Sequence, residues 1–357
     1  MDTKGSRIIQ SEKVDAIFIS SPANMRAVSG FTGEGYLYIS QCTQMVVTDF
    51  RYMIAAKEEC PGWQIVDMNG AYFEPLVEIL YREQTRLLGY EMEHITMHQF
   101  NQICNLYRER GKGKLEFQNI DSALRQMRMI KSDEEIHYIE KAEEIGDLAF
   151  EQILKELKVG LTEKEVAARL EFYMKSLGAD GLSFDTIAAS GIHSAMPHAV
   201  PTDKRLEEGD FLTLDFGCRY HGYCSDMTRT VVIGKADEKQ KRLYYLVLEA
   251  QELVLQKVRP GMTGREVDAI ARNFIHKAGY GNHFGHGLGH SVGLEIHESP
   301  SFSKREDRRI EPGMVITVEP GIYIEGFGGV RIEDVICMTE SGCRNLTHSP
   351  KDLIEIN

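Results

Sequence analysis

Hydrophobic and polar positions follow two different periods in the first third of the chain. Four short apolar runs, rich in β-branched and aromatic residues, have the length of strands and span residues 14–20, 35–40, 44–49 and 86–91. Three longer stretches repeat their apolar residues at roughly helical spacing and span residues 49–60, 72–83 and 96–110. Strands that alternate with helices predict an α/β domain, and this pattern ends near Ile120.

A long helix with a recognisable start signal follows a short junction. Ser132 stands three residues before Glu135, which is the spacing of a capping box. An amphipathic pattern then continues to Leu157. We therefore divide the chain into an N-terminal domain, residues 1–125, and a C-terminal domain, residues 126–357.

The C-terminal domain contains an internal duplication. The segment GLTEKEV, residues 160–166, recurs as GMTGREV, residues 261–267, so that the offset is 261 − 160 = 101 residues. Further on, GDFLTLDFG (209–217) matches GMVITVEPG (313–321) at an offset of 313 − 209 = 104. Two matches in the same order and at nearly the same offset indicate two related half-domains around a pseudo-twofold axis. A site between them would draw ligands from both halves.

Four acidic residues stand in apolar, strand-like surroundings, and in the second match two of them align. They are Asp215, Asp226, Glu319 and Glu333. Buried carboxylates are costly unless they are paired or bind a metal, so these four require a common positive charge. Arg229 and Arg331 could supply it in a buried ion-pair network. Alternatively, two divalent cations would neutralise all four acids, and one imidazole would complete an oxygen-rich set suited to manganese, cobalt, iron or zinc.

A histidine- and glycine-rich stretch could provide that imidazole. The sequence GHGLGHSVGLEIHE, residues 285–298, carries His286, His290 and His297. Its four glycines disfavour a helix by roughly 1 kcal/mol each relative to alanine. They predict strand or loop backbone that passes close to a neighbouring segment. A zinc-protease motif H-E-x-x-H is excluded, because no second histidine follows His297 and Glu298 at the required spacing.

Five short motifs resemble those of the pita-bread metallopeptidases, the superfamily of methionine aminopeptidase, aminopeptidase P and prolidase. They are LDFG with Asp215, SDMTRT with Asp226, GHGLGH with His290, TVEPGIY with Glu319 and VRIED with Glu333. The resemblance covers the chain from about residue 133 to the end. It implies that this part is an α+β pita-bread catalytic domain. His286 has no ligand role in that pattern, and we expect it to be a supporting or packing residue.

The resemblance also implies a ligand set for two divalent metal ions, with manganese as the first choice and cobalt, zinc or iron as alternatives. Asp215 is expected to bind one ion. Asp226 and Glu333 are expected to bridge both ions, and His290 and Glu319 to complete the second site.

Three residues are expected, by the same resemblance, to act in catalysis. Glu319 is expected to take a proton from water, His297 to contact the substrate carbonyl, and His198 to assist the leaving group. From its position in VRIED, Arg331 is expected to orient Glu333 and to keep it ionised.

The N-terminal domain narrows the choice within the superfamily. The segment SSPANMRAVSGFTG, residues 20–33, is similar to the domain shared by creatinase, prolidase and aminopeptidase P. Ala27 and Val28 stand where these proteins usually have an aromatic residue. Methionine aminopeptidases lack such a domain, and creatinase lacks the metal-binding acids. Aminopeptidase P and prolidase remain, and both cut the bond that precedes proline.

The residue after the H-E motif favours one of these two activities. In some microbial prolidases an arginine four residues after the histidine holds the C-terminal carboxylate of a dipeptide, and here that position is Ser301. We therefore predict an Xaa-Pro aminopeptidase that acts on short peptides. The alternative is an Xaa-Pro dipeptidase, and a third, less favoured hypothesis is a non-catalytic pita-bread binding module.

Composition and charge limit the partners and the compartment. The net charge of −13 argues against a nucleic-acid partner and against an anionic membrane surface. Seven scattered cysteines without a C-x-x-C pair, and the absence of a signal-peptide pattern, favour the cytoplasm. The resemblance implies a homodimer.

Overall fold

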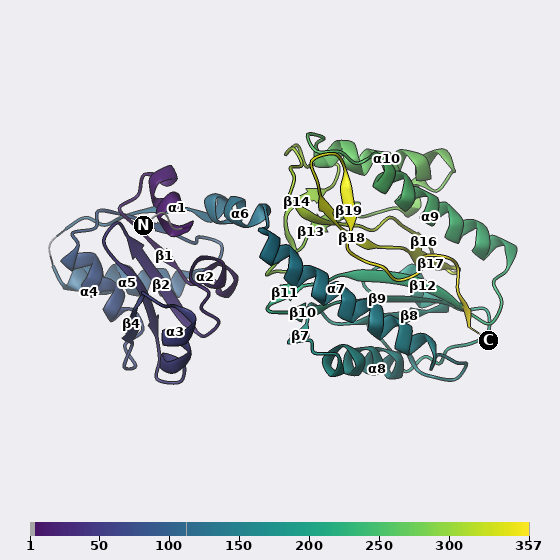
Figure 1. Ribbon diagram of the computed structural model, residues 1–357, viewed down its shortest axis with the longest axis horizontal. Helices are drawn as coiled ribbons and strands as arrows, with labels where there is room; N and C mark the ends of the chain where they lie inside the picture. The colour runs from purple at the N-terminus through teal and green to yellow at the C-terminus, as the bar shows by residue number, and fades with distance from the viewer. Residues whose placement is uncertain (1–3, 112, 357) are drawn as a thin grey trace. The chain divides into compact units, whose positions relative to one another are not determined.

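The computed structural model describes residues 4–111 and 113–356. The chain divides into two compact units, residues 1–128 and 129–357. Figure 1 labels most of the helices and strands of both units. Across the described ranges, no helix combines the length and the apolar character needed to cross a membrane.

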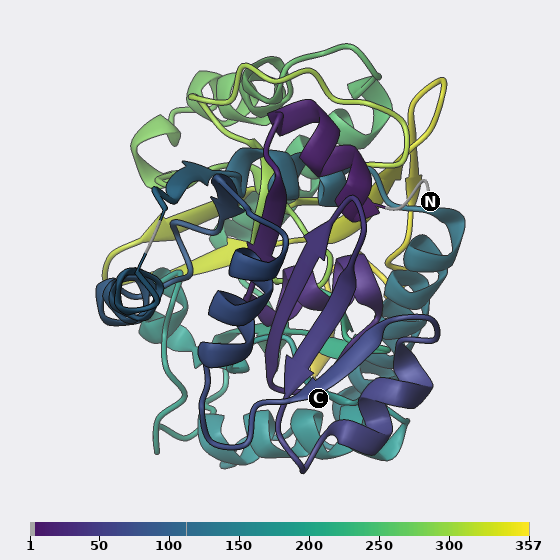
Figure 2. The ribbon, with the colours of Figure 1, turned by 90° about the vertical axis from the view of Figure 1, so that its left-hand side faces the viewer.

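A six-stranded mixed sheet forms the centre of the first unit (Figure 2). Its strands, in their order across the sheet, are β4 (Gln64–Asp67), β3 (Gln44–Thr48), β2 (Gly35–Ser40), β1 (Ala16–Ile19), β5 (Leu87–Tyr90) and β6 (Glu116–Asn119). β1 pairs antiparallel with β2 and parallel with β5. The four predicted strands are β1, β2, β3 and β5. The two that the apolar pattern did not predict, β4 and β6, are the edge strands, whose side chains are partly exposed.

Helices cover both faces of this sheet, because alternate residues of a strand point to opposite faces. In β1, Ala16 and Phe18 join one apolar cluster, while Ile17 and Ile19 join the other. The helices that contribute to the first cluster are α4 (Glu74–Arg82) and α5 (Met97–Glu109). Those that contribute to the second are α1 (Lys4–Glu12), α2 (Pro22–Ser29), α3 (Met53–Glu59) and α6 (Asp121–Met129).

The junction between the units is helical, which the sequence analysis did not predict. α6 spans both the expected boundary after residue 125 and the division after residue 128. Its sequence, DSALRQMRM, contains neither glycine nor proline and consists largely of good helix formers.

The second unit packs four helices against two larger sheets. The helices are α7 (Asp133–Leu154), α8 (Glu163–Ser176), α9 (Glu238–Lys257) and α10 (Gly264–Lys277). One sheet has the order β20 (Glu355–Ile356), β12 (Met227–Ile233), β9 (Phe211–Phe216) and β8 (Ile187–Ser190). The other has the order β14 (Glu298–Phe302), β13 (Gly289–Ser291), β15 (Val315–Val318), β18 (Asp334–Met338) and β19 (Cys343–Asn345).

Shorter elements connect these sheets. They are β7 (Gly181–Leu182), β10 (Cys218–Tyr220) and β11 (Tyr223–Cys224), the hairpin of β16 (Gly321–Ile324) with β17 (Gly328–Arg331), and the 3₁₀ turns η1 (Gly191–Ala195) and η2 (Gly281–His283). α7 and α8 pack on the sheet of β9 and β12, whereas α9 and α10 pack with β15 and β18 in a second apolar core.

The predicted duplication is confirmed by matching backbone contacts. In each half, the threonine that caps a helix also forms an isolated antiparallel bridge with an arginine: Thr162 with Arg205, and Thr263 with Arg309. Each arginine donates a hydrogen bond to the carbonyl of the glycine that opens its repeat, at 2.6 and 2.5 Å respectively. The same local structure is therefore built twice, with one pair of helices and one sheet in each half.

Candidate active site

Two antiparallel ladders carry the four carboxylates that the sequence analysis singled out. Asp215 lies in β9, and Asp226 directly precedes β12, which pairs with β9. Glu319 directly follows β15, and Glu333 directly precedes β18, which pairs with β15. Each half of the duplicated sequence therefore brings two acids to the same end of one strand pair.

The two ladders meet at Thr228 and Glu333. The Glu333 amide donates to the Thr228 carbonyl at 3.1 Å, and Thr228 Oγ1 donates to Glu333 Oε2 at 2.6 Å. Thr230 Oγ1 donates to the Arg331 carbonyl at 3.0 Å. Because side chains alternate along a strand, Asp226 shares the face of Thr228 and Thr230. The acids of both halves thus converge where the ladders meet.

His290 faces these carboxylates from β13. Its Nε2 lies 3.5 Å from Asp226 Oδ2 and 3.6 Å from Glu319 Oε1. Its Nδ1 donates to the Ser291 carbonyl at 3.2 Å, which leaves Nε2 able to act as a ligand. Burial, with the neighbouring His297, lowers the pKa of His290 to about 4. The imidazole is therefore neutral near pH 7, which is the form that binds metals.

The glycine-rich backbone around His290 passes close to a neighbouring strand, as predicted. A Cβ at Gly289 would lie 2.0 Å from the carbonyl oxygen of Thr317 in β15. Only glycine lets the two strands approach this closely. The close approach places His290 beside the strand that ends at Glu319.

Burial and mutual repulsion oppose ionisation of the carboxylates. Burial, followed by the charges of Glu333, Asp215 and Glu319, raises the pKa of Asp226 well above its ordinary value. Burial and the charge of Glu319 do the same to the pKa of Glu333. Burial raises the pKa of Glu319 to about 8, although Arg331 acts in the opposite direction. A group of acids in this condition requires additional positive charge.

Arg331 supplies one positive charge, and its direct partner is Asp215. Nη2 of Arg331 donates to Asp215 Oδ2 at 2.6 Å. The expected link to Glu333 runs through Thr228, whose Oγ1 accepts from Arg331 Nε at 3.0 Å. The long side chain extends past the carboxylate that is close to it in the sequence and reaches the neighbouring ladder. Arg331 therefore connects the acids of the two halves.

An ion-pair network alone does not neutralise the group. Arg229, the other candidate cation, pairs with Asp334 instead. Asp215 Oδ1 is buried and has no hydrogen-bond partner. Among the described residues, Arg331 is thus the one arginine that forms an ion pair with any of the four acids, and its partner is Asp215.

The donor set fits divalent metal ions. One potential ligand atom from each of Asp226, His290 and Glu333 lies within 4.8 Å of the other two. The unpaired Oδ1 of Asp215 is a further available oxygen. Carboxylate oxygens with a single imidazole nitrogen suit first-row divalent cations better than thiolate-selected metals.

A cavity of about 510 Å³ opens over this group. All five expected ligands line it: Asp215, Asp226, His290, Glu319 and Glu333. His198 and His297, which are expected to contact substrate, line the same cavity. The ring of His297 lies edge-on to that of His290, with centroids 4.4 Å apart. Burial and the neighbouring His198 lower the pKa of His297.

Sequence reasoning missed a hydrogen-bonded chain beside the acids. Arg331 Nη1 donates to the Tyr323 hydroxyl at 2.8 Å, and that hydroxyl donates to His286 Nε2 at 2.9 Å. His286 Nδ1 donates to the Gly287 carbonyl at 2.7 Å. Burial lowers the pKa of His286 to about 4, in agreement with a neutral ring. Tyr323 lies four residues after Glu319, within TVEPGIY, and that motif was its only signal.

Comparison with known proteins now defines the class. The metallopeptidase family M24 matches residues 137–340, and the creatinase/prolidase N-terminal domain matches residues 4–130. An Xaa-Pro dipeptidase of Pyrococcus furiosus is 40% identical over 351 residues, which cover 98% of this chain and 97% of the relative.

Two solved structures are similar over nearly the whole chain. An Xaa-Pro dipeptidase from Bacillus anthracis has a TM-score of 0.93 at 41% identity and covers 99% of both chains. An X-Pro aminopeptidase from Thermotoga maritima has a TM-score of 0.91 at 39% identity and covers 98% of this chain and 100% of the other.

The chain therefore belongs to the metallopeptidase family M24. It is a metal-dependent hydrolase with a creatinase/prolidase N-terminal domain and a pita-bread catalytic domain, as the resemblance implied.

The raised carboxyl pKa values predict how the stability of the metal-free protein changes between pH 7 and pH 8. Glu319 has a pKa of about 8 when folded against an ordinary value of 4.5, so the folded state binds more protons across this window. Stability therefore falls as the pH rises, by up to about 1.4 kcal/mol per pH unit for each such carboxyl. His286 and His290, whose pKa values fall from 6.5 to about 4 on folding, bind protons only in the unfolded state near pH 6.5 and there oppose this trend. Above pH 7 the unfolded imidazoles are mostly neutral as well, so their opposing contribution is small.

Urea unfolding of the metal-free protein across this pH window measures the slope. Glu319→Gln, which has no ionisable carboxyl, should give a shallower slope. A stability that stays constant or rises with pH in the unsubstituted protein would contradict the prediction.

Proposed function

We propose that this protein is an Xaa-Pro dipeptidase, which hydrolyses the bond between an amino-acid residue and a C-terminal proline. The observation that carries the proposal is the convergence of four carboxylates and one imidazole on the wall of a single cavity. Full-length similarity to Xaa-Pro dipeptidases supports the substrate class. The comparisons favour this alternative over the aminopeptidase that Ser301 led us to predict.

Two divalent cations, manganese first and cobalt, zinc or iron as alternatives, form the proposed cofactor. Asp215 would hold one ion, His290 and Glu319 would hold the second, and Asp226 and Glu333 would serve both. When bound, such a pair supplies Lewis acidity and lowers the pKa of water towards neutrality. The donor chemistry of these residues and the unpaired Asp215 oxygen support the assignment.

Glu319, in addition to its role as a ligand, and the other groups of the cavity act on the substrate and on protons. Glu319 accepts a proton from the attacking water. His297 directs an N–H towards the carbonyl oxygen that becomes negatively charged, and His198 assists the departing proline nitrogen. Phe184 and Ile187 belong to the cavity lining, offer apolar contact to a proline ring and help to exclude water.

One observation keeps an Xaa-Pro aminopeptidase as the second candidate. Ser301, which stands where the resemblance places an arginine in some prolidases, pairs with His290 across β13 and β14 and lines the cavity. Among the described residues of the lining, Arg331 is the one arginine or lysine, and it is bound by Asp215. A dipeptide carboxylate would then rely on neutral donors such as the hydroxyls of Ser301 and Ser303.

Dipeptide and tripeptide substrates separate these candidates. With Mn²⁺ added, we expect release of alanine from Ala-Pro at a higher kcat/KM than from Ala-Pro-Ala. A chelator should abolish the release and Mn²⁺ should restore it, whereas Asp226→Asn should lose both bound Mn²⁺ and activity. Cleavage of the tripeptide alone would establish the aminopeptidase. A Mn²⁺-loaded protein that cleaves neither peptide would favour a binding module.

Introducing a positively charged side chain at position 301 tests how the protein binds the carboxylate of the substrate. Ser301→Arg should lower the KM for Ala-Pro about tenfold, because a charge-assisted hydrogen bond stabilises binding more than a neutral one. The KM for Ala-Pro-Ala and both kcat values should change little. Ser301→Gln is the matched control, since it adds length without charge, and an equal effect in this variant would exclude a charge contact.

We also propose a homodimer in a reducing compartment, the cytoplasm. All seven cysteines are free, which supports the compartment. Large apolar side chains on the surface, among them Phe50 and Ile54 in the first unit and Ile192 and Val200 in the second, support self-association. Sedimentation at micromolar concentration should give twice the mass of one chain, and cell fractionation tests the compartment. A single-chain mass would exclude the dimer.

A further inference from the structure

The strand that begins after Asp226 turns a charged side chain away from the acids. Arg229 lies in β12, one residue from Thr228, and therefore points to the opposite face of the sheet. Its side chain is 1% exposed. A buried guanidinium is costly unless its N–H groups find acceptors. The partners of Arg229 are therefore informative about its role.

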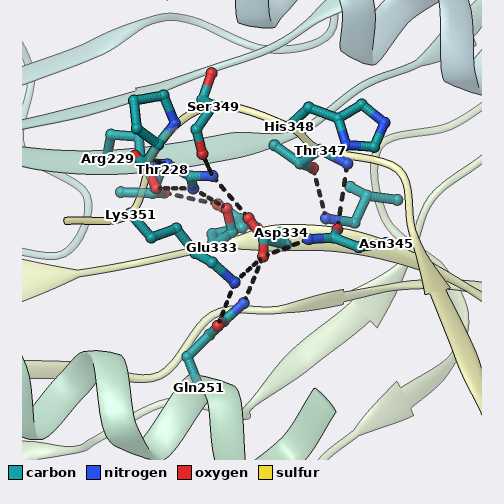
Figure 3. Close-up of polar contacts among 12 residues, drawn as sticks. Thr228, Arg229, Gln251, Glu333, Asp334, Asn345, Thr347, His348, Ser349 and Lys351 are labelled. Atoms are coloured by element: carbon teal, nitrogen blue, oxygen red, sulfur yellow. Dashed lines mark hydrogen bonds and ion pairs between the residues drawn. The ribbon is translucent and has the colours of Figure 1, made fainter. Parts of the chain in front are cut away.

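Every nitrogen of this guanidinium donates to a protein oxygen (Figure 3). The acceptors are the carbonyls of Thr228 (3.0 Å) and Glu333 (2.5 Å) for Nη1, Asp334 Oδ1 (2.8 Å) and the Ser349 carbonyl (2.9 Å) for Nη2, and the Pro350 carbonyl (3.1 Å) for Nε. The Glu333 carbonyl lies between the ends of β17 and β18, where a side-chain donor takes the place of a ladder partner.

Asp334 connects Arg229 to the end of the chain. Its Oδ2 accepts hydrogen bonds from Lys351 Nζ, Gln251 Nε2 and Asn345 Nδ2, each at 2.8 Å (Figure 3). With its other oxygen on Arg229, the carboxylate is fully engaged and buried. Neither Asp334 nor Arg229 is therefore available as a surface group. Both serve to hold the backbone around them.

The C-terminal segment, defined here as residues 345–351, is also linked to the proposed ligand Asp226. The link runs through Glu143 in α7. Glu143 accepts the amide N–H of Asp226 at 2.9 Å and the hydroxyl of Thr347 at 2.8 Å. Thr347 Oγ1 also accepts the amide of Val335 at 2.9 Å. The C-terminal segment is thus linked to the backbone of both ligands that are proposed to be shared. Glu143 connects it to the amide of Asp226, and Arg229 connects it to the carbonyl of Glu333.

We propose that Arg229 is a positioning residue for the metal centre, and that the C-terminal segment is the anchor against which it holds Asp226 and Glu333. This inference rests on the proposed ligand set. Arg229 contacts neither carboxylate group. Its planar fork fixes the carbonyl of Glu333 relative to the strand that follows Asp226, so the spacing of the two shared ligands depends on it.

The substitution Arg229→Lys tests the multiple hydrogen bonds of the planar guanidinium separately from its positive charge. Lysine keeps a positive charge beside Asp334, but a single ammonium cannot reach the carbonyls of Glu333, Ser349 and Pro350 at once. We expect the affinity of the metal-free, full-length protein for Mn²⁺ to fall 10- to 100-fold, the range usual for groups that orient metal ligands. The kcat for Ala-Pro should fall while its KM changes little.

Leu170→Ala is the matched control for a general loss of stability. Leu170 is fully buried in the apolar core formed with α8, outside the network of Arg229. The variant should unfold at a lower temperature and still bind Mn²⁺ with the affinity of the unsubstituted protein.

Undiminished Mn²⁺ affinity in Arg229→Lys would overturn the inference, and so would an equal loss in Leu170→Ala. If Arg229→Lys does not fold, Thr347→Val decides, because it removes the hydroxyl on Glu143 and keeps the shape of the side chain. A several-fold weaker affinity would then support the anchor, and an unchanged affinity would overturn it. Failure of the unsubstituted protein to bind any Mn²⁺ would instead remove the ligand set itself, and the inference with it.

Discussion

Four carboxylates share one desolvated pocket, and they cannot all be ionised there without added positive charge. Burial costs each anion its hydration, and every neighbour adds repulsion, so proton uptake or cation binding must relieve the group. Within the described part of the chain, one guanidinium, that of Arg331, pairs with this group. The imidazole of His290 remains neutral beside it. The fold therefore holds the acids close together although their burial and mutual repulsion are unfavourable, and divalent ions offset this cost.

The β-sheets meet this requirement by dividing polar groups between two faces. Asp226 lines the cavity, and Thr228 on the same face donates to Glu333, which also lines it. Arg229, one residue further, faces the other way. Glu333 and Asp334 repeat the same division at the start of β18. Each face of the sheet thus holds its own set of acidic and basic groups, and backbone contacts connect the two sets. The duplicated halves supply the two sheets, and their junction supplies the cavity.

Sequence reasoning predicted the parts of this arrangement that have a local pattern. Acids in apolar strands, capping boxes and repeated motifs depend on neighbouring residues, and so the duplication could be predicted. Strands β4 and β6 could not, because edge strands are partly exposed and lack a continuous apolar run. The partner of Arg331 and the role of Tyr323 were also missed, since the reach of a long side chain across two ladders is not encoded in residue spacing.

Backbone contacts that exclude a side chain set the geometry of both ladders. A Cβ at Gly289 would collide with the carbonyl of Thr317, and one at Gly217 would collide equally, at 2.0 Å, with the carbonyl of Ser225, the residue before Asp226. Even a methyl group at either glycine would force the strands apart and displace a neighbouring acid or imidazole. The centre is therefore vulnerable at two positions that carry no functional group. An inactivating alanine substitution there would reflect lost room and not lost chemistry.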